Sequence, residues 1–563
     1  MKYLVTGKQA AMIDRYTIEE MGVPQLVLME RAALAVAEEV SDCIQDKKRD
    51  RILVVAESGN NGGDGVAAAR ILCQRGYRAE VWALGGIRKP SDAFIKQTEL
   101  AKLAGVPFIT PPEAGEDNAE DAVSGYRVIV DAIFGVGLTR EVGGVQKDAV
   151  DRINRARASA ESGMTVIAVD IPSGISSENG EILGTAVKAD RTVTFGFEKV
   201  GMRFAKEACG TVLVREIGFY LPEWFGTGAF GDVQSTEDGT EKETCFISYE
   251  KEDVPALLPK RSADGNKGSY GRVLVAAGSE DIYGAAYLAA EAAYRTGCGL
   301  VKVVTHENNR AMLQQALPEA LMLTYGSACS REEKGQDRTA GPEEITSVFE
   351  EEFRKSVRWA SVIILGPGLG QTDMSRFLLE TVLKEAVCPV IADADAINLL
   401  SEQTGLLEET AGQRPLILTP HMLEMTRLTE QTQHPERQAL EKLKKERIGI
   451  TEETAKRYRA CLVLKDACTV VTGGGPDGAG ESMVYLNGSG CDAMAKGGSG
   501  DVLTGMIAGL IAQGLPAPEA ARTGVYLHGL AGETAAKKKG RYGVIGRDLI
   551  ESISDVMSID QIG

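Results

Sequence analysis

Apolar positions in the first half of the chain alternate between the spacing of helices and that of buried strands. Residues 26–44 place apolar side chains three and four positions apart, which predicts a helix with one apolar face. Residues 51–56 and 165–170 are continuous apolar runs, typical of strands buried on both faces. Strands separated by helix-length segments predict a largely parallel sheet. The other expected elements are a helix over 66–75 and strands over 79–84, 127–131, 192–195 and 211–217.

A polar, Gly-rich and acidic stretch then interrupts the alternation. Residues 223–246 are predicted to be a linker, so we expect one domain over 1–222 and another over 247–563. Residues 331–345 are also polar and predict an exposed loop. The strands expected in the second half cover 272–277, 300–305, 361–365, 389–392, 415–419 and 461–464, and its last helices cover 499–513 and 517–538. The predicted fold class is therefore α/β, with two tandem domains.

Length and composition agree with two globular domains. A chain of 563 residues exceeds a typical single domain, and its 44% hydrophobic and 25% charged residues are ordinary for a globular protein. Gly is in excess, with 64 residues against only 19 Pro. Because this is not a collagen-like or linker composition, the Gly excess is expected at particular turns.

Charge, His and Cys narrow the function. A net charge of −18 argues against nucleic acids and anionic membranes as partners, although helix N-termini can still bind small anions. The four His and ten Cys form neither HExxH nor CxxC, which disfavours zinc. Scattered Cys suggest reduced thiols, and the chain lacks a signal-type segment and any apolar run of 18 residues. We therefore expect a cytoplasmic protein.

The first candidate site follows the strand over 51–56. Residues 58–65 are Gly-rich and lead into a helix, so their backbone amides can face an anion. Asn60, Asn61 and Asp64 add side chains suited to an amide, a ribose or a cation. A tight turn with capping residues is the alternative interpretation.

Further polar residues follow the next strands. Asp131, Asp170 and Ser173 are expected to converge with Asn61, since carboxyl ends of parallel strands share one edge. Such an all-oxygen set suits a hard cation or a sugar. Asp170 alone could also be a cap, and Lys199 alone a solvated surface charge.

These motifs, over roughly residues 1–220, resemble the NAD(P)H-hydrate epimerase family, which implies a Rossmann-like domain. The resemblance implies that a potassium ion is bound by Asn61, Asp131 and Ser173. It implies acid–base catalysis at the hydrated ring carbon, with Asp170 and Lys199 as candidates. The residues implied to bind the hydrated nucleotide are Asn60, Asn61, Gly62, Gly63, Asp64, Gly135, Val136, Gly137, Leu138, Thr139, Arg140, Glu141 and Asp170.

The second candidate site lies near the C-terminus. Gly497, Gly498 and Gly500 precede an apolar helix and expose amides able to stabilise a transferring phosphoryl group. Asp501, in the first turn, is placed to take a proton from a hydroxyl group. A helix cap followed by close helix packing is the alternative. Other polar clusters follow the predicted strands at 366–370, 393–398, 419–424 and 465–469.

This half, about residues 246–560, resembles the ribokinase-like fold and, within it, the ADP- or ATP-dependent NAD(P)H-hydrate dehydratases. The resemblance implies that Asp501 is the base that activates the ring hydroxyl for phosphorylation, with Mg²⁺ accompanying ADP. The implied contacts are Ala285, Gly368, His421 and Asp501 for the hydrate, and Lys465, Asp466, Ala467, Cys468, Thr469 and Gly500 for the nucleotide. We also expect a homo-oligomer.

Three positions depart from the usual family pattern. Asp466 replaces a Gly, Met422 and Leu423 replace Pro-Gly, and residues 491–493 replace Asn-Pro-Gly. Asp466 would be unfavourable beside a phosphate unless a cation or Lys496 offsets its charge.

The favoured hypothesis is a fused, two-activity repair enzyme acting on NAD(P)H hydrates and ADP. The alternatives are a small-molecule kinase for a hydroxymethyl pyrimidine or thiazole alcohol, and a first domain kept only as a binding module. The first-half motif and the strand end at 419–424 favour repair over a kinase, and the presence of Asp131, Asp170 and Ser173 argues against lost catalysis.

Overall fold

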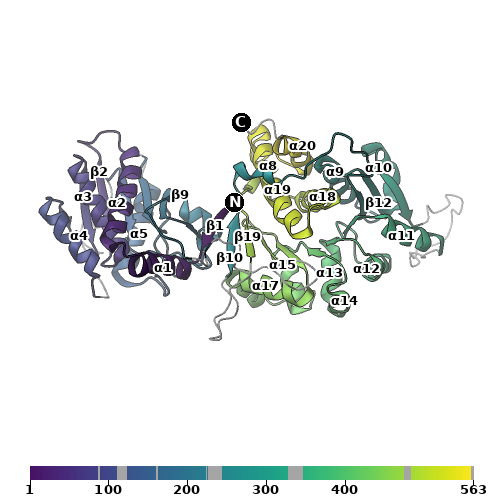
Figure 1. The fold of residues 1–563 in the computed structure, drawn as a ribbon, viewed down its shortest axis with the longest axis horizontal. Coiled ribbons are helices and arrows are strands. Elements are labelled where there is room, and N and C mark those ends of the chain that lie inside the picture. Colours follow the sequence, from purple (N-terminus) through teal and green to yellow (C-terminus); the bar gives the residue numbers. More distant parts are fainter. Residues whose placement is uncertain are drawn as a thin grey trace. The chain divides into compact units, whose positions relative to one another are not determined.

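The computed structural model divides the chain into two compact units (Figure 1). One unit is Tyr3–Glu241, and the other is Lys242–Gly563 with Met1–Lys2. The boundary falls inside the predicted linker, most of which lies outside the described residues, as does the predicted loop over 331–345. The described residues are 1–85, 89–110, 123, 125–159, 163–222, 225, 244–326, 347–473 and 483–558.

The first unit is built on a parallel sheet. Its strands follow the order β4-β3-β2-β5-β6-β7-β9. From β2 the chain proceeds outward to β4 and then returns to form β5 on the other side of β2, which creates a switch point between these two strands. The strands are β2 (Arg51–Ala56), β3 (Arg78–Ala83), β4 (Phe108–Ile109), β5 (Val128–Ala132), β6 (Thr165–Val169), β7 (Arg191–Phe195) and β9 (Thr211–Arg215). Separately, β1 (Lys2–Val5) pairs in parallel with β8 (Glu198–Lys199).

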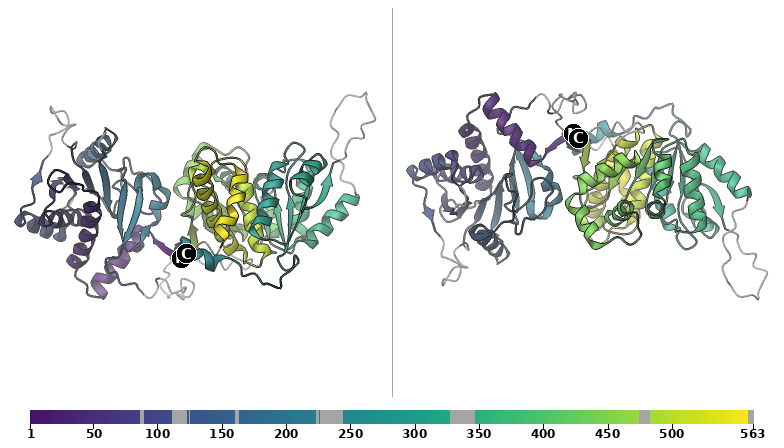
Figure 2. Two further views of the ribbon diagram at one scale, coloured as in Figure 1. Left: turned by 90° about the horizontal axis from the view of Figure 1, so that it is seen from above. Right: turned by 90° about the horizontal axis from the view of Figure 1, so that it is seen from below.

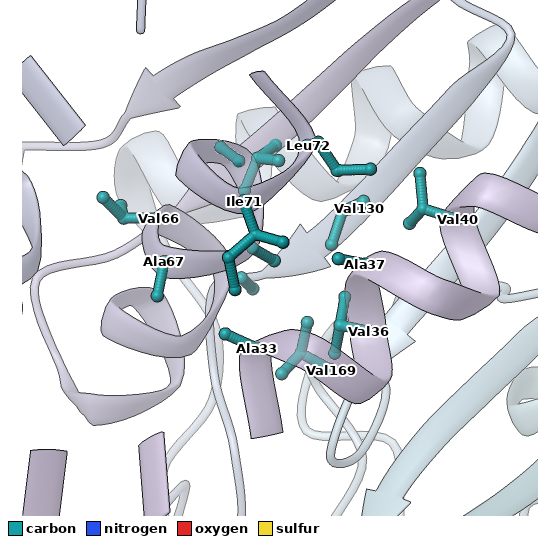
Figure 3. Close-up of a cluster of buried hydrophobic side chains, with 14 of the residues drawn as sticks. Ala33, Val36, Ala37, Val40, Val66, Ala67, Ile71, Leu72, Val130 and Val169 are labelled. Atoms are coloured by element: carbon teal, nitrogen blue, oxygen red, sulfur yellow. The ribbon is translucent and has the colours of Figure 1, made fainter. Parts of the chain in front are cut away.

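Helices cover both faces of this sheet. Val54 of β2 belongs to a buried cluster with α2, α3 and α4, whereas its neighbours Leu53 and Val55 pack with α5. Figure 3 shows Val36 of α2 and Ile71 of α3 in the first cluster. The helices are α1 (Gly7–Arg15), α2 (Gln25–Asp42), α3 (Asn60–Gln74), α4 (Asp92–Leu103), α5 (Gly144–Ser159), α6 (Val200–Phe204) and α7 (Lys206–Cys209).

The second unit has a longer sheet with its own switch point. The order is β13-β12-β11-β14-β15-β16-β17-β18-β19-β10, and the chain reverses direction across the sheet between β11 and β14. Only the pairs of β18 with β17 and β19 are antiparallel among these described strands. The strands are β10 (Cys245–Ser248), β11 (Arg272–Ala276), β12 (Leu300–His306), β13 (Leu321–Tyr325), β14 (Val362–Leu365), β15 (Val390–Ala392), β16 (Leu416–Leu418), β17 (Cys461–Leu464), β18 (Val470–Thr472) and β19 (Met483–Leu486).

Close helix packing shapes the second unit. At Gly505 of α18, a Cβ atom would lie 2.3 Å from the Ala289 carbonyl oxygen of α9, so only glycine permits this approach. Both views in Figure 2 show the yellow C-terminal helices side by side. The helices are α8 (Val254–Leu257), α9 (Gly284–Thr296), α10 (Arg310–Ala316), α11 (Ser347–Trp359), α12 (Asp373–Glu385), α13 (Asp395–Glu402), α14 (Thr404–Thr410), α15 (Met422–Glu430), α16 (Arg437–Lys445), α17 (Arg447–Tyr458), α18 (Ser499–Ala512), α19 (Ala517–Lys539) and α20 (Gly546–Met557).

The predicted α/β class with two tandem domains is confirmed, but one helix boundary is wrong. The helix expected over 66–75 begins at Asn60, so the Gly-rich segment forms its first turns. A Cβ at Gly62 would lie 1.7 Å from the Glu57 carbonyl oxygen, and one at Gly65 would lie 2.4 Å from Ala132 Cβ. These glycines therefore allow the helix to pack closely against the sheet.

None of the helices in the described part of the chain is both long enough and apolar enough to cross a membrane.

Candidate active sites

The first unit contains a cavity of about 480 Å³ at its switch point. The rings of Phe195, Phe197 and Phe219 supply an apolar part of its wall, which suits a flat ring such as nicotinamide. Most residues predicted to bind or transform the hydrate line it: Asn60, Asn61, Asp64, Gly135, Val136, Gly137, Leu138, Arg140, Asp170 and Lys199. The predicted residues that lie in the same segments but outside the lining are Gly62, Gly63, Thr139 and Glu141.

The N-terminus of α3 opens into this cavity. Gly59 is the N-cap residue, and both it and Asn60 line the cavity wall. The buried Glu57 carboxylate fixes the entry by accepting hydrogen bonds from Gly59 N at 3.1 Å and from Ser58 Oγ at 3.0 Å. Since the first amides of a helix have no partner within the helix, this end can bind an anionic group.

The predicted cation ligands form a buried oxygen cluster beside the cavity. Ser173 donates to Asp131 through its amide at 2.8 Å and its hydroxyl at 2.6 Å, and both residues are fully buried. Burial raises the pKa of Asp131 to about 6, despite hydrogen bonds from Ser173 and Ile133 that lower it. Within the described part of the chain, no ion pair reaches this carboxylate.

Asn61, the third predicted cation ligand, comes from the first turn of α3. Its Nδ2 atom is buried and has no hydrogen-bond partner among the described residues, so part of the amide's bonding capacity is unused. A Cβ at Gly135 would lie 3.2 Å from Asn61 Oδ1, which places the amide against the loop that follows β5. The Asp131 carboxylate, the Ser173 hydroxyl and the Asn61 side-chain carbonyl all offer oxygen atoms, the ligand type that hard cations prefer.

Lys199 and Asp170 form a buried ion pair in the same cavity. Lys199 Nζ lies 2.5 Å from Asp170 Oδ1 and donates to Thr194 Oγ1 at 2.8 Å, with Lys199 only 2% exposed. Asp170 has φ = 67°, an unusual backbone conformation for a residue other than glycine, and its amide donates to the Val193 carbonyl. Such backbone strain gathers at functional sites. Lys199 is thus a buried partner of Asp170 rather than a solvated surface charge.

The second unit brings a lysine and two carboxylates together at its sheet edge. Lys465, after β17, lies 2.5 Å from the buried Asp393, which follows β15. Burial alone would lower the pKa of Lys465, but Asp393, Glu424 and Asp501 together raise it. Burial and the charge of Asp393 raise the pKa of Asp501 to about 6, against the lowering effect of Lys465. Asp501 is therefore a stronger base than an ordinary aspartate.

The Gly-rich segment before α18 has the geometry of an anion site. Gly498 is the N-cap residue with φ = 92°, and Asp501 lies in the first turn of the helix. A Cβ at Gly500 would lie at an ordinary contact distance, 3.4 Å, from Lys465 Nζ, so the first turn of α18 lies close to the lysine. The helix amides and Lys465 can together stabilise a phosphoryl group.

His421 caps the N-terminus of α15. Its Nδ1 accepts hydrogen bonds from Leu423 N at 3.1 Å and Glu424 N at 3.2 Å, so the proton of the neutral ring lies on Nε2. Burial and Lys465 lower the pKa of His421. Burial raises the pKa of the neighbouring Glu424 to about 7. The one N–H donor of the neutral imidazole, at Nε2, lies 3.2 Å from Glu424 Oε1.

The remaining predicted hydrate contacts lie at the switch point between β11 and β14. A Cβ at Gly368, which has φ = 58°, would lie 3.0 Å from Ala285 Cβ. Gly278, after β11, donates to the Pro367 carbonyl at 2.8 Å. The two segments are therefore adjacent, as expected for a ligand site in an open parallel sheet.

The predicted nucleotide segment connects β17 to β18, and a cation other than Lys496 offsets the charge of Asp466. Arg447 Nη1 lies 3.0 Å from Asp466 Oδ2, whereas Lys496 donates to the Tyr542 carbonyl. Arg447, at the start of α17, is therefore the cation that offsets Asp466, and Lys496 is not. Thr469 Oγ1 donates to the carbonyl of Asp466. The buried Cys468 directs its Sγ toward the Asn487 carbonyl. Ala467 and Cys468 can therefore contact a nucleotide mainly through their backbone atoms.

Two residues near the sites were missed from the sequence. His528, on α19, lies 3.3 Å from Ser499 Oγ at the start of α18, and burial lowers its pKa to about 4. Asp14, on α1, lines the cavity of the first unit. Both residues are far in sequence from the motifs, and only the position of Asp14 between the buried Ile13 and Thr17 could have drawn attention to it.

These geometries define a two-domain α/β enzyme with one site for acid–base chemistry and one for phosphoryl transfer. Residues 273–555 match the sequence model of a family described as NAD(P)H-hydrate dehydratase, and residues 25–201 match one described as YjeF-related protein N-terminus. The chain belongs to the family of bifunctional NAD(P)H-hydrate repair enzymes, which combine an epimerase domain with a dehydratase domain.

Similar proteins cover the chain from end to end. It is 33% identical to a bifunctional NAD(P)H-hydrate repair enzyme of Moorella thermoacetica over 99% of this chain and 96% of that protein. A protein of the same description from Coxiella burnetii is 32% identical over 98% of both chains. Among solved structures, an ADP/ATP-dependent NAD(P)H-hydrate dehydratase of Bacillus subtilis, co-crystallised with ATP and Mg²⁺, is 31% identical and covers 55% of this chain and 96% of that chain, with a TM-score of 0.42.

Proposed function

We propose that the cavity of the first unit interconverts the R and S hydrates of NADH and NADPH, and that Asp501 begins dehydration of the S hydrate in the second unit. The observation that supports epimerisation most strongly is the Lys199–Asp170 ion pair in a cavity with an aromatic wall. For the second step it is Asp501, whose pKa is raised to about 6, beside the amides that begin α18.

Epimerisation requires a proton acceptor and a proton donor at the hydrated ring. In the proposed step, the Asp170 carboxylate takes the proton of the ring hydroxyl, while the adjacent carbon–nitrogen bond breaks and its electron pair goes to the ring nitrogen. An aldehyde results, and closure on its other face gives the opposite configuration. Lys199 and Thr194 hold the carboxylate of Asp170 in place. The amides at the start of α3 bind a phosphate of the nucleotide.

We propose that Asn61, Asp131 and Ser173 hold the potassium ion beside this cavity. The buried Asp131 carboxylate, which no cationic side chain of the described residues meets, and the oxygen atoms of Ser173 and Asn61 support this assignment. The ion would supply positive charge next to the bound nucleotide. Replacing K⁺ by choline is expected to lower the thermal stability of the chain, and Asp131→Asn is expected to remove that dependence on K⁺. Equal stability in both salts would contradict the assignment.

Dehydration begins with proton abstraction. Asp501 takes the proton of the ring hydroxyl, whose oxygen then attacks the terminal phosphorus of ADP and releases AMP. The ring nitrogen lone pair next expels phosphate and, with loss of a ring proton, restores the dihydronicotinamide. Lys465 and the amides near Gly500 stabilise the transferring phosphoryl group, and His421 contacts the hydrate.

Mg²⁺ is proposed to enter with the nucleotide, where it neutralises phosphate charge. Among the described residues no cluster of three His, Cys, Asp or Glu side chains could hold a metal. This agrees with Mg²⁺, which binds mainly to phosphate oxygens and water.

Two assays test the two activities separately. With pure R hydrate and no nucleotide, the chain should produce the S hydrate, measured by chromatography. With pure S hydrate, ADP and Mg²⁺, it should yield reduced nucleotide, AMP and phosphate in equal amounts. Asp170→Asn should abolish only the first activity and Asp501→Asn only the second. Absence of either product from the parent chain would contradict the corresponding half of the proposal.

We further propose that the chain acts in the cytoplasm as a homo-oligomer. Free thiols throughout the described residues and the net charge of −18 support a reducing environment without nucleic-acid partners. Sedimentation of the purified chain should give a mass above 60.1 kDa, and a monomer would contradict the oligomer.

A further inference from the structure

Asp14 is a carboxyl group of the epimerase cavity that the proposed chemistry has not yet used. It lines the same cavity as Asp170 and Lys199, and it comes from α1. That helix lies outside residues 25–201, the segment that matches the YjeF-related family model. Helix α1 therefore supplies part of the cavity wall from outside the segment that matches the family model.

Contacts at both ends hold α1 against the cavity. At its start, Thr6 and Gln9 form a reciprocal capping box, and Lys8 N donates to Glu178 Oε1 at 3.0 Å. Just beyond its end, the buried Thr17 accepts from Tyr220 N at 3.0 Å. Asp14 lies between these anchors, so its position in the wall is fixed by the fold.

The surroundings of Asp14 differ from those of Asp170. Asp170 is paired with Lys199, whereas no hydrogen bond or ion pair within the described residues reaches the Asp14 carboxyl. Burial, and then the negative charge of Asp170, raise the pKa of Asp14, which favours the protonated acid. The two carboxyl groups of one cavity thus have different surroundings, because Asp170 is paired with a lysine and Asp14 meets no cationic side chain among the described residues.

We propose that Asp14 is the proton donor of the epimerase, acting on the ring nitrogen while Asp170 takes the proton of the ring hydroxyl. As the carbon–nitrogen bond breaks, its electron pair takes the proton of Asp14. On closure this proton returns to Asp14, and Asp170 gives its proton back to the new hydroxyl oxygen. Protons and electrons balance without a further reactant. This inference rests on the proposed epimerase function.

Other charged groups facing the cavity bear on its titration. The groups that line it besides Asp14 are Glu57, Asp64, Arg140, Asp170 and Lys199. Burial and the charges of Asp170 and Asp14 raise the pKa of Asp64 as well. Variants must therefore be compared at several pH values.

The test uses the full chain, R hydrate and no nucleotide. Asp14→Asn should lower the kcat of epimerisation about 100-fold, with KM within about threefold, because a general acid acts in the transition state. Asp14→Glu should recover a large part of that loss, and the exposed control Glu19→Gln should behave as the parent. The alkaline limb of kcat/KM, where the acid loses its proton, should disappear in Asp14→Asn.

Dehydration of the S hydrate provides the internal control, and it should be unchanged in every variant. A kcat for Asp14→Asn within about threefold of the parent, or a loss confined to KM, would overturn the inference. If the parent itself fails to interconvert the hydrates, the proposed function fails instead. If Asp14→Asn loses the thermal transition of the first unit, Asp14→Glu decides: a shifted alkaline limb supports the inference, and an unchanged limb overturns it.

Discussion

The two units each contain a lysine–aspartate pair at the sheet edge, but they use it differently. In both pairs the lysine Nζ lies 2.5 Å from a carboxylate oxygen. In the first unit the paired residue, Asp170, is itself the candidate base. In the second unit the lysine pairs with Asp393, and the candidate base is Asp501, whose pKa is raised to about 6. In the first pair the lysine holds the candidate base itself. In the second pair the aspartate holds a lysine beside the candidate base.

Asp501→Asn should give the largest effect. Loss of a general base is expected to lower kcat/KM for dehydration about 1,000-fold, while epimerisation is unchanged. Steady-state assays of both reactions on one protein sample measure the separation. Near-parental dehydration would show that Asp501 is not the base, and the contrast between the two units would be lost.

Lys199→Met tests the pair in the first unit. It leaves the Asp170 carboxylate without its partner, which should destabilise the first unit by about 3–5 kcal/mol and reduce epimerisation strongly. The double variant with Asp170→Asn should recover most of the stability but none of the activity. Urea unfolding of the single and double variants measures the coupling. An unchanged stability of Lys199→Met would contradict a structural role of the pair.

The pH dependence of dehydration should report on Asp501 of the second unit alone. Asp501 must be deprotonated to act, so kcat/KM for dehydration should fall as the pH drops through about 6, approaching tenfold per pH unit. Stopped assays between pH 5 and 8 would measure this limb. If the midpoint of this limb lay near the ordinary pKa of aspartate, the site would not raise the pKa of Asp501.

Arg447→Ala should have the smallest effect. Without Arg447, the charge of Asp466 is expected to repel the nucleotide and raise the KM for ADP about fivefold, with kcat unchanged. Asp466→Asn is the matched control, because it removes the charge and should make Arg447→Ala harmless. An equal effect of Arg447→Ala in both backgrounds would mean that Arg447 acts by another route.

The sequence predicted the parts of the sites that follow strands, and it missed those that reach them from elsewhere. Asp131 and Asp170 follow buried apolar runs, so their convergence follows from a parallel sheet. Arg447 and Asp14 come from helices whose packing no local pattern reveals. The start of α3 was also missed, because Gly62 and Gly65 resemble a turn until their close packing against the sheet is known.

The most direct test of two separate sites on one chain is complementation in a single reaction. An equal mixture of R and S hydrates of NADH is incubated with ADP, Mg²⁺ and K⁺, and the reduced-nicotinamide absorbance is followed. Asp170→Asn alone should stop at the S fraction, Asp501→Asn alone should give no recovery, and the two variants mixed should give full recovery. A mixture that recovers no more than Asp170→Asn alone would contradict the account.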